Sequence, residues 1–178
     1  MSDHRGSPDA GSHLKDTQAV LVRPFRPADQ AEARGLVLAG LGEHFGFIDE
    51  TLNPDLDDID AHYIRRGDEF FVAELDGRIA GTAGLIFESA DVARIVRMSV
   101  DARCRRSGIA SALVAACKEA ARRRGATDLH VFTEPHWEDA VAFYTAQGFV
   151  MYGRDSIDIH LRLPIDESPS VRMMRYNS

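Results

Sequence analysis

The chain has 178 residues, of which 44% are hydrophobic and 28% charged, with a formal net charge of −7. These values indicate a globular protein with one sizeable core. The acidic balance argues against nonspecific nucleic-acid binding, and no apolar run is long enough for a membrane span. Residues 1–17 are polar and predicted to be disordered, without the apolar core of a signal peptide, so a cytoplasmic location is expected.

The first half of the chain shows strand and helix patterns in turn. A strand is expected at residues 19–25, a helix at 26–41 and a second helix at 54–66. Two apolar runs over residues 69–88 are joined by Asp76-Gly77, which is typical of a β-hairpin.

The second half predicts a parallel strand pair. A strand at residues 93–100, a helix at 108–124 and a strand at 128–134 form a unit with a right-handed crossover. A short helix at 137–147 follows, and then two strands at 149–154 and 157–163. The domain is placed at 18–163 with a C-terminal tail at 164–178. The expected fold is α/β, with a mixed, mostly antiparallel sheet, flanking helices and a central parallel pair.

The stretch RCRRSGIASALV, residues 103–114, collects positive charge where a helix begins. Arginine is unfavourable at the positive end of a helix dipole. These arginines are therefore more readily explained by ligand binding than by a role in the fold. Gly108 leaves the backbone open to an anion, and Ala110 is small, so a pyrophosphate cradle is predicted. The alternative is that Ser107 caps the helix and Gly108 only makes a turn. Cys104 and Cys117 fit no zinc spacing and no disulfide framework, so no metal is predicted.

Residues 105–110, RRSGIA, resemble the acetyl-CoA-binding motif of the GCN5-related N-acetyltransferases (the GNAT family), Arg/Gln-x-x-Gly-x-Gly/Ala. The resemblance extends from about Val20 to Leu163, and the RMSV…GIASALV pattern is similar to small camello-like members. It implies the acyl-CoA N-acyltransferase fold, acetyl-CoA as cosubstrate and a small-molecule amine as acceptor. It implies no nucleic-acid or membrane partner, and it allows a homodimer.

The resemblance also implies roles for particular residues. The backbone of Met98, Ser99 and Val100 is expected to pair with the pantetheine arm. The pyrophosphate is expected to be held by one run of residues: Arg105, Arg106, Ser107, Gly108, Ile109, Ala110 and Ser111. Tyr144 falls where many members keep a tyrosine near the CoA sulfur, and a phenol can protonate the departing thiolate. The alternative is that Tyr144 is only a core aromatic.

Two positions depart from the family pattern. Arg94 stands where some members have a general-base glutamate, and Trp137 stands where members often have an asparagine. The acceptor amine must still lose a proton before it attacks. Glu134, at the end of a strand, is our hypothesis for the base, directly or through water. The other candidates are Glu88, His130 and His136.

The acceptor side gives two opposing signals. Residues 43–60 are rich in acid, which would attract a cationic amine or would only cap a helix. Arg94 and Arg97 would instead meet a carboxylate. Strict alternation puts Arg97 and Ser99 on one strand face and Arg94, Val96 and Met98 on the other. Two alternatives to a small-molecule acetyltransferase are a non-catalytic acyl-CoA-binding protein and an enzyme that acts on protein or peptide amines.

Overall fold

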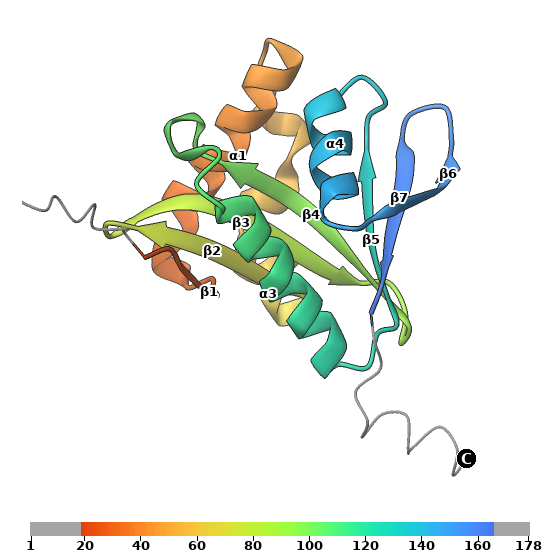
Figure 1. The fold of residues 1–178 in the computed structure, drawn as a ribbon. Coiled ribbons are helices and arrows are strands. Elements are labelled where there is room, and N and C mark those ends of the chain that lie inside the picture. Colours follow the sequence, from red (N-terminus) through yellow and green to blue (C-terminus); the bar gives the residue numbers. More distant parts are fainter. Residues whose placement is uncertain (1–18, 166–178) are drawn as a thin grey trace, which may run out of the picture.

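A computed structural model describes residues 19–165, which form one open sheet of seven strands (Figure 1). The strand order is β1-β2-β3-β4-β5-β7-β6. The strands are β1 (Leu21–Pro24), β2 (Glu69–Leu75), β3 (Arg78–Phe87), β4 (Val92–Val100), β5 (Asp128–Thr133), β6 (Val150–Arg154) and β7 (Ile159–Pro164). The β4–β5 pair is parallel and every other pair is antiparallel, which confirms the expected mixed sheet.

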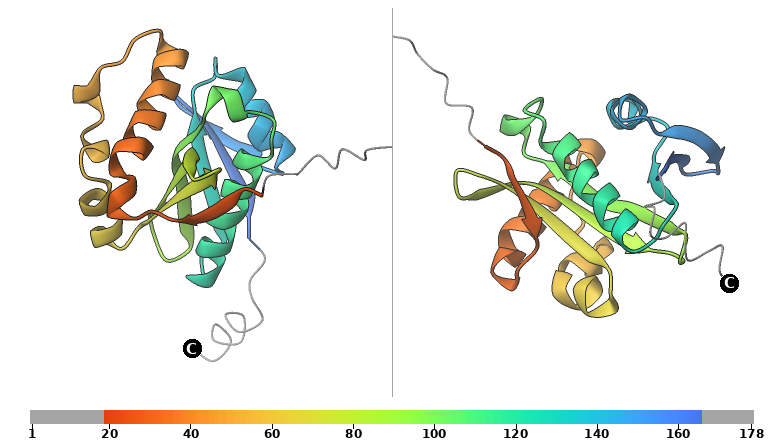
Figure 2. Two further views of the ribbon diagram at one scale, coloured as in Figure 1. Left: turned by 90° about the vertical axis from the view of Figure 1, so that its left-hand side faces the viewer. Right: turned by 60° about the horizontal axis from the view of Figure 1, so that its bottom comes forward.

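Helices cover both faces of the sheet (Figure 2). The helices are α1 (Gln30–Phe45), α2 (Ile59–His62), α3 (Ile109–Arg123) and α4 (Glu138–Ala146). One apolar cluster joins α1 and α2 to the sheet, and the other joins α3 and α4 to it. Since both clusters meet at β3, seven consecutive residues of this strand, 79–85, are buried. A central strand covered on both faces reads as a continuous apolar run, which explains the pattern RIAGTAGLIF.

The helix expected at residues 54–66 is broken into three short pieces. A 3₁₀ turn at Pro54–Leu56 comes first, then α2, and then a 3₁₀ turn at Ile64–Arg66. The carboxylate of Asp58 accepts a hydrogen bond from the Ala61 amide, so it begins a new helix inside the expected one. Gly67, with φ of 87°, ends the segment.

The predicted N-terminal tail, residues 1–17, lies outside the described residues, as does most of the predicted C-terminal tail. Two residues of the latter belong to the folded part: Pro164 ends β7, and Ile165 is buried and donates its amide to the Thr127 carbonyl at 2.7 Å. No helix within residues 19–165 is long and apolar enough to cross a membrane.

Candidate active site

The parallel pair at the centre of the sheet is short and leaves a gap. β4 and β5 are paired only from Val92 with Asp128 to Ile95 with Val131. β4 continues for five more residues, to Val100, without β5 as a partner. Its backbone along 96–100 therefore presents hydrogen-bonding groups on the β5 side that an extended ligand can pair with.

A bulge lies in β4 at the start of this gap. Arg97 has φ of 52°, and the register with β3 shifts between Thr82 and Gly84. The Thr82 hydroxyl donates to the Arg97 carbonyl at 3.0 Å, and the Arg97 guanidinium donates to both oxygens of Asp55 at 2.9 and 2.6 Å. A positive φ is costly for arginine, so backbone and side chain are both held to keep the bulge. Such strained positions are concentrated at functional sites.

The bulge overturns the expected assignment of the β4 side chains to the two faces. Arg94 and Val96 lie on the α1/α2 face, as Arg97 and Ser99 do: Arg94, Val96 and Arg97 line one cleft there, and the Ser99 hydroxyl donates to the Leu36 carbonyl of α1. Of Arg94, Val96 and Met98, only Met98 packs on the α3 side. The prediction was wrong because the extra bulge residue shifts the alternation by one.

The predicted pyrophosphate cradle forms the turn between β4 and α3. Gly108 is the N-cap residue of α3, with φ of 84°, and Arg106 also has a positive φ, of 63°. No side chain caps α3, and the Ser107 hydroxyl donates instead to the Cys104 carbonyl. The first amides of α3 are therefore left for a ligand, and a Cβ at Gly108 would meet nothing within 4 Å. This geometry suits a phosphate and does not support the alternative in which Ser107 caps the helix.

The side chains of the cradle differ in their contacts. Arg105 forms an ion pair with Glu43 in the last turn of α1. Arg106 is exposed and has no ion pair within the described residues. Ile109 is the first residue of α3 and is buried, and Ala110 follows it in the first turn. The Ser111 hydroxyl accepts a hydrogen bond from the Gln147 amide at 3.0 Å.

Tyr144 of α4 lies in the core cluster on the α3/α4 face. It is 5% exposed, and its ring packs edge-on against Phe143 and Phe149. Burial raises the pKa of its hydroxyl. The phenol therefore keeps its proton at neutral pH, as a proton donor requires.

A cleft of about 470 Å³ opens on the α1/α2 face where the parallel pair ends. Its charged side chains come from the two 3₁₀ turns that flank α2, from the residue before β2 and from β4, and they are Asp55, Arg66, Asp68, Arg94 and Arg97. Burial raises the pKa of the Asp55 carboxyl, but hydrogen bonds from Arg97 and Tyr63 outweigh it, so the net pKa lies below its usual value. Asp55 is therefore an anion already paired with Arg97.

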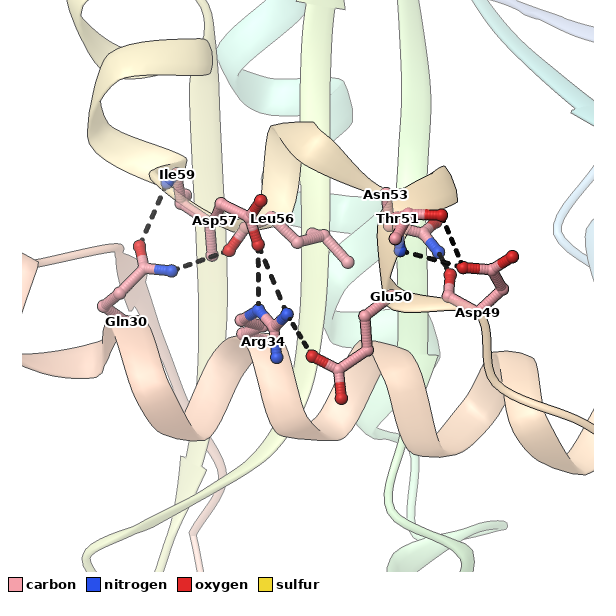
Figure 3. A network of polar contacts seen from close by, with 9 residues as sticks. All are labelled: Gln30, Arg34, Asp49, Glu50, Thr51, Asn53, Leu56, Asp57 and Ile59. Atoms are coloured by element: carbon pink, nitrogen blue, oxygen red, sulfur yellow. Dashed lines mark hydrogen bonds and ion pairs between the residues drawn. The ribbon is translucent and has the colours of Figure 1, made fainter.

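Most acids of the segment between α1 and α2 pair with arginines, and Figure 3 shows the two that pair with Arg34. Arg34 of α1 donates to Glu50 at 2.6 Å and to Asp57 at 3.2 Å. Gln30 clamps the same segment, since it donates to the Leu56 carbonyl at 2.7 Å and accepts from the Ile59 amide at 3.0 Å. These contacts hold the segment on α1, which supports the structural reading of these acids.

Two of the base candidates, Glu88 and His130, contact other side chains. Arg94 pairs with Glu88 and lies over the Phe132 ring at 4.9 Å. His130 contacts the Tyr152 hydroxyl at 3.0 Å, and burial lowers its pKa. His136 is exposed, with no partner within the described part of the chain.

Glu134 is placed differently, because it contacts a residue that the sequence did not single out. Its Oε2 lies 3.4 Å from Nε2 of His44, in the last turn of α1. The His44 ring is stacked on Trp137, with ring centroids 3.9 Å apart and planes inclined by 12°. Glu134 thus contacts α1, whereas Tyr144 is packed in the apolar cluster of α3 and α4.

Comparison with known proteins assigns the family. A model described as "Acetyltransferase (GNAT) family" matches residues 40–149, which span the cradle, both strands of the gap and α4. The protein belongs to the GNAT family. This family uses acetyl-CoA, and the cradle and gap described above fit that molecule's pyrophosphate and pantetheine.

Relatives with curated names agree with this assignment. N-acetyltransferase 8 from Rattus norvegicus is 34% identical over 119 residues, which cover 64% of this chain and 54% of the relative. N-acetylaspartate synthetase from Rattus norvegicus is 39% identical over 69 residues, covering 38% of this chain and 23% of the relative. The chain thus spans only about half the length of N-acetyltransferase 8. The names confirm the camello-like resemblance.

Solved GNAT structures share the fold. An acetyltransferase of the GNAT family from Staphylococcus aureus Mu50 superposes with a TM-score of 0.76 at 21% identity, covering 83% of this chain and all of the other. PaiA N-acetyltransferase from Thermoplasma acidophilum, in complex with coenzyme A, superposes with a TM-score of 0.73 at 14% identity, covering 82% of this chain and 99% of the other. At these identities the likeness concerns the fold.

Two residues near this candidate site were missed by the sequence reasoning. The sequence around His44 carried no local signal of a role for it, except that Gly40, four residues earlier, lies on the same helix face. Arg66 lines the cleft at the end of a 3₁₀ turn that was expected to be continuous helix. Both were missed because their surroundings are formed by segments that are distant in the sequence.

Proposed function

We propose that the protein transfers the acetyl group of acetyl-CoA to the primary amine of a small acceptor that also carries a carboxylate. Acetyl-CoA would bind with its pyrophosphate at the start of α3 and its pantetheine along residues 98–100. The acceptor would enter from the cleft on the opposite face. Both molecules would be bound together, and the amine would attack the thioester directly.

The observation that carries the proposal is the layout of the gap between β4 and β5. The cradle and Tyr144 lie on the α3/α4 side, while the cleft and Glu134 lie toward α1. In this proposal, Tyr144 would donate a proton to the thiolate from the CoA side, and the ammonium would lose its proton to a base on the side of Glu134. This is the division of roles that direct amine attack requires.

The chemical step balances with these groups alone. The ammonium gives one proton to a base, and its nitrogen lone pair forms a bond to the thioester carbonyl carbon. A backbone N–H of the 98–100 stretch stabilises the resulting oxyanion. The carbon–sulfur bond then breaks, and the thiolate takes the proton of the Tyr144 hydroxyl. As the acetamide forms, the attacking nitrogen loses its second proton, which returns through water to the Tyr144 phenolate. The products are the acetamide and CoA, with one proton left on the base.

Charge in the cleft supports an acceptor with a carboxylate. Of its three arginines, Arg94 is paired with Glu88 and Arg97 with Asp55. Arg66 has no such partner within the described residues and is exposed. An unpaired guanidinium is a strong binder of carboxylates. The name of N-acetylaspartate synthetase, whose product is an acetylated amino acid, points the same way.

Replacing Arg66 by alanine tests the acceptor class. The assay compares an amino acid with the amine that lacks only its carboxylate. We expect Arg66→Ala to raise KM about tenfold or more for the amino acid, since a hydrogen bond between charged groups contributes about 1.5–3 kcal/mol, and to leave the plain amine unchanged. Arg65→Ala is the matched control, because Arg65 is paired with Asp60 and does not line the cleft. Equal effects on both acceptors would reject the carboxylate.

The two alternatives make different predictions in the same assay. A non-catalytic acyl-CoA-binding protein would bind acetyl-CoA and release no thiol with any amine. An enzyme for protein amines would prefer peptides over every free amino acid. Either result would replace the proposal.

A further inference from the structure

His44 lies in the last turn of α1, next to the gap between β4 and β5. One turn earlier, Gly40 packs so closely on β4 that a Cβ there would come within 2.6 Å of the Ser99 hydroxyl. Glu43, the residue before His44, pairs with Arg105 of the cradle. The last turn of α1 therefore extends from β4 across the gap. At the end of β5 it contacts Glu134 through His44.

The imidazole of His44 is held in one orientation. Its face stacks on Trp137, its Nε2 lies 3.4 Å from Glu134 Oε2, and the Phe45 ring packs against it edge-on with centroids 4.7 Å apart. The His44 side chain is 17% exposed and that of Glu134 is 37% exposed. With Nε2 facing the carboxylate, Nδ1 has no partner within the described residues. A histidine oriented by a carboxylate through one nitrogen and open at the other is the arrangement of a general base.

The other histidines near the site are less suited to this role. The His62 ring contacts the Asp58 carbonyl at 3.0 Å, and the His160 ring contacts Asp155 at 3.0 Å in the β6–β7 hairpin. Arg94, at the position of the family's glutamate base, is a cation paired with Glu88. Among the described histidines, His44 alone pairs with a carboxylate at the end of β5.

We propose that His44 is the proton acceptor for the acceptor amine and that Glu134 acts through it. The ammonium N–H bond breaks, its electron pair stays on the amine nitrogen, and the proton forms a new N–H bond at Nδ1 of His44, directly or through one water. The Nε2–H donates to Glu134, whose negative charge stabilises the imidazolium. Charged groups around the ring are Glu134 from the end of β5 and, from the cradle side, the pair of Glu43 and Arg105. The proton then passes to solvent.

This inference rests on the proposed acetyl transfer and assigns its base. It predicts that His44→Gln lowers kcat/KM about 100-fold near neutral pH, within the usual contribution of a general base. The loss should shrink as the pH rises toward the pKa of the amine itself, because a neutral amine needs no base. Glu134→Gln should lower the rate less than His44→Gln, since it leaves the acceptor nitrogen in place.

A rescue experiment separates proton transfer from a structural role. His44→Ala leaves a space against Trp137, and added imidazole should restore part of the lost rate in a concentration-dependent manner. A histidine that only holds α1 in place would not be replaced by free imidazole at pH values where imidazole is neutral. His136→Gln tests the rival candidate, whose ring is exposed and unpaired within the described residues; if His44 is the base, the pH–rate profile of this variant should equal that of the wild type.

The outcomes distinguish this inference from the proposed function. If the wild type turns over and His44→Gln keeps its rate and its pH–rate profile, His44 is not the base and the acetyl transfer stands. If His136→Gln shows the shifted profile instead, the base is His136. If the wild type turns over no amine while binding acetyl-CoA, the proposed function and this inference both fall.

Discussion

Replacing Gly81 by alanine tests whether the position of the α3 N-terminus controls cofactor binding. Gly81 lies in β3, directly beneath the first turn of α3. A Cβ there would lie 2.6 Å from Ile109 Cγ2, 3.0 Å from Leu113 Cδ1 and 3.4 Å from Ala73 Cβ. The Leu113 methyl is at the end of a flexible side chain, but Cγ2 of Ile109 is bonded to its Cβ, so the helix backbone itself must move.

The size of the effect follows from these distances. Carbon atoms in contact prefer about 3.5–4.0 Å, so the start of α3 must shift by about 1 Å. Overpacking of this kind costs about 1–3 kcal/mol of stability. Because Ile109 directly follows Gly108, the same shift moves the cradle amides. A displacement of about 1 Å at a positioned group costs up to about 100-fold in rate.

The assay is urea unfolding together with calorimetric titration of acetyl-CoA. We expect Gly81→Ala to lower the free energy of unfolding and to weaken acetyl-CoA binding about tenfold, which corresponds to about 1.4 kcal/mol. Gly35→Ala is the matched control, since a Cβ at Gly35 of α1 meets nothing within 4 Å and alanine stabilises a helix by up to about 1 kcal/mol. A Gly81→Ala protein that is destabilised yet binds acetyl-CoA normally would refute the cradle's dependence on this contact.

Three further substitutions test the site and its support. Tyr144→Phe keeps the buried ring, so the melting temperature should stay near that of the wild type while kcat falls about 100-fold; unchanged turnover would reject Tyr144 as the acid. Asp55→Asn leaves the half-buried Arg97 without its anion, and we expect a loss of about 1–3 kcal/mol in urea unfolding with a lower kcat; an unchanged midpoint would contradict the role of this pair in holding the bulge. The hydrogen bonds from Arg23 hold the pKa of Asp29 below its usual value, although burial opposes them. Its stabilisation is therefore complete above the unfolded-state pKa of about 3.9 and is lost as the pH falls through the lower folded-state pKa. Unfolding between pH 2 and 7 should show Asp29→Asn less stable at neutral pH and with a shallower acid decline; parallel curves for the two proteins would exclude this linkage.

Local patterns were sufficient to predict the order of the elements and the glycine turn before α3. The Asp76-Gly77 turn, the glycine before α3 and the apolar periods are set by neighbouring residues, so the chain itself carries their signal. Helix α1 runs to Phe45, four residues beyond the expected end at Leu41, because Gly46, with φ of 75°, is the left-handed stop.

The acceptor side depended on tertiary contacts that no local pattern contains. The bulge at Arg97 requires Thr82 and Asp55, from two other segments, and it places Arg97 on the same face as Arg94. The contact between His44 and Glu134 joins residues 90 positions apart. Charge composition alone left both readings of residues 43–60 open, because their arginine partners on α1 and β4 become neighbours only in the folded chain.

The most direct test of acetyl transfer is thiol release from acetyl-CoA with a panel of acceptors, followed across a pH series. The panel contains amino acids, their decarboxylated amines, polyamines, aminoglycosides and short peptides. The account predicts release with amino acids, with a rate that rises with pH. No release with any acceptor, while acetyl-CoA still raises the melting temperature, would contradict catalysis and leave a binding protein.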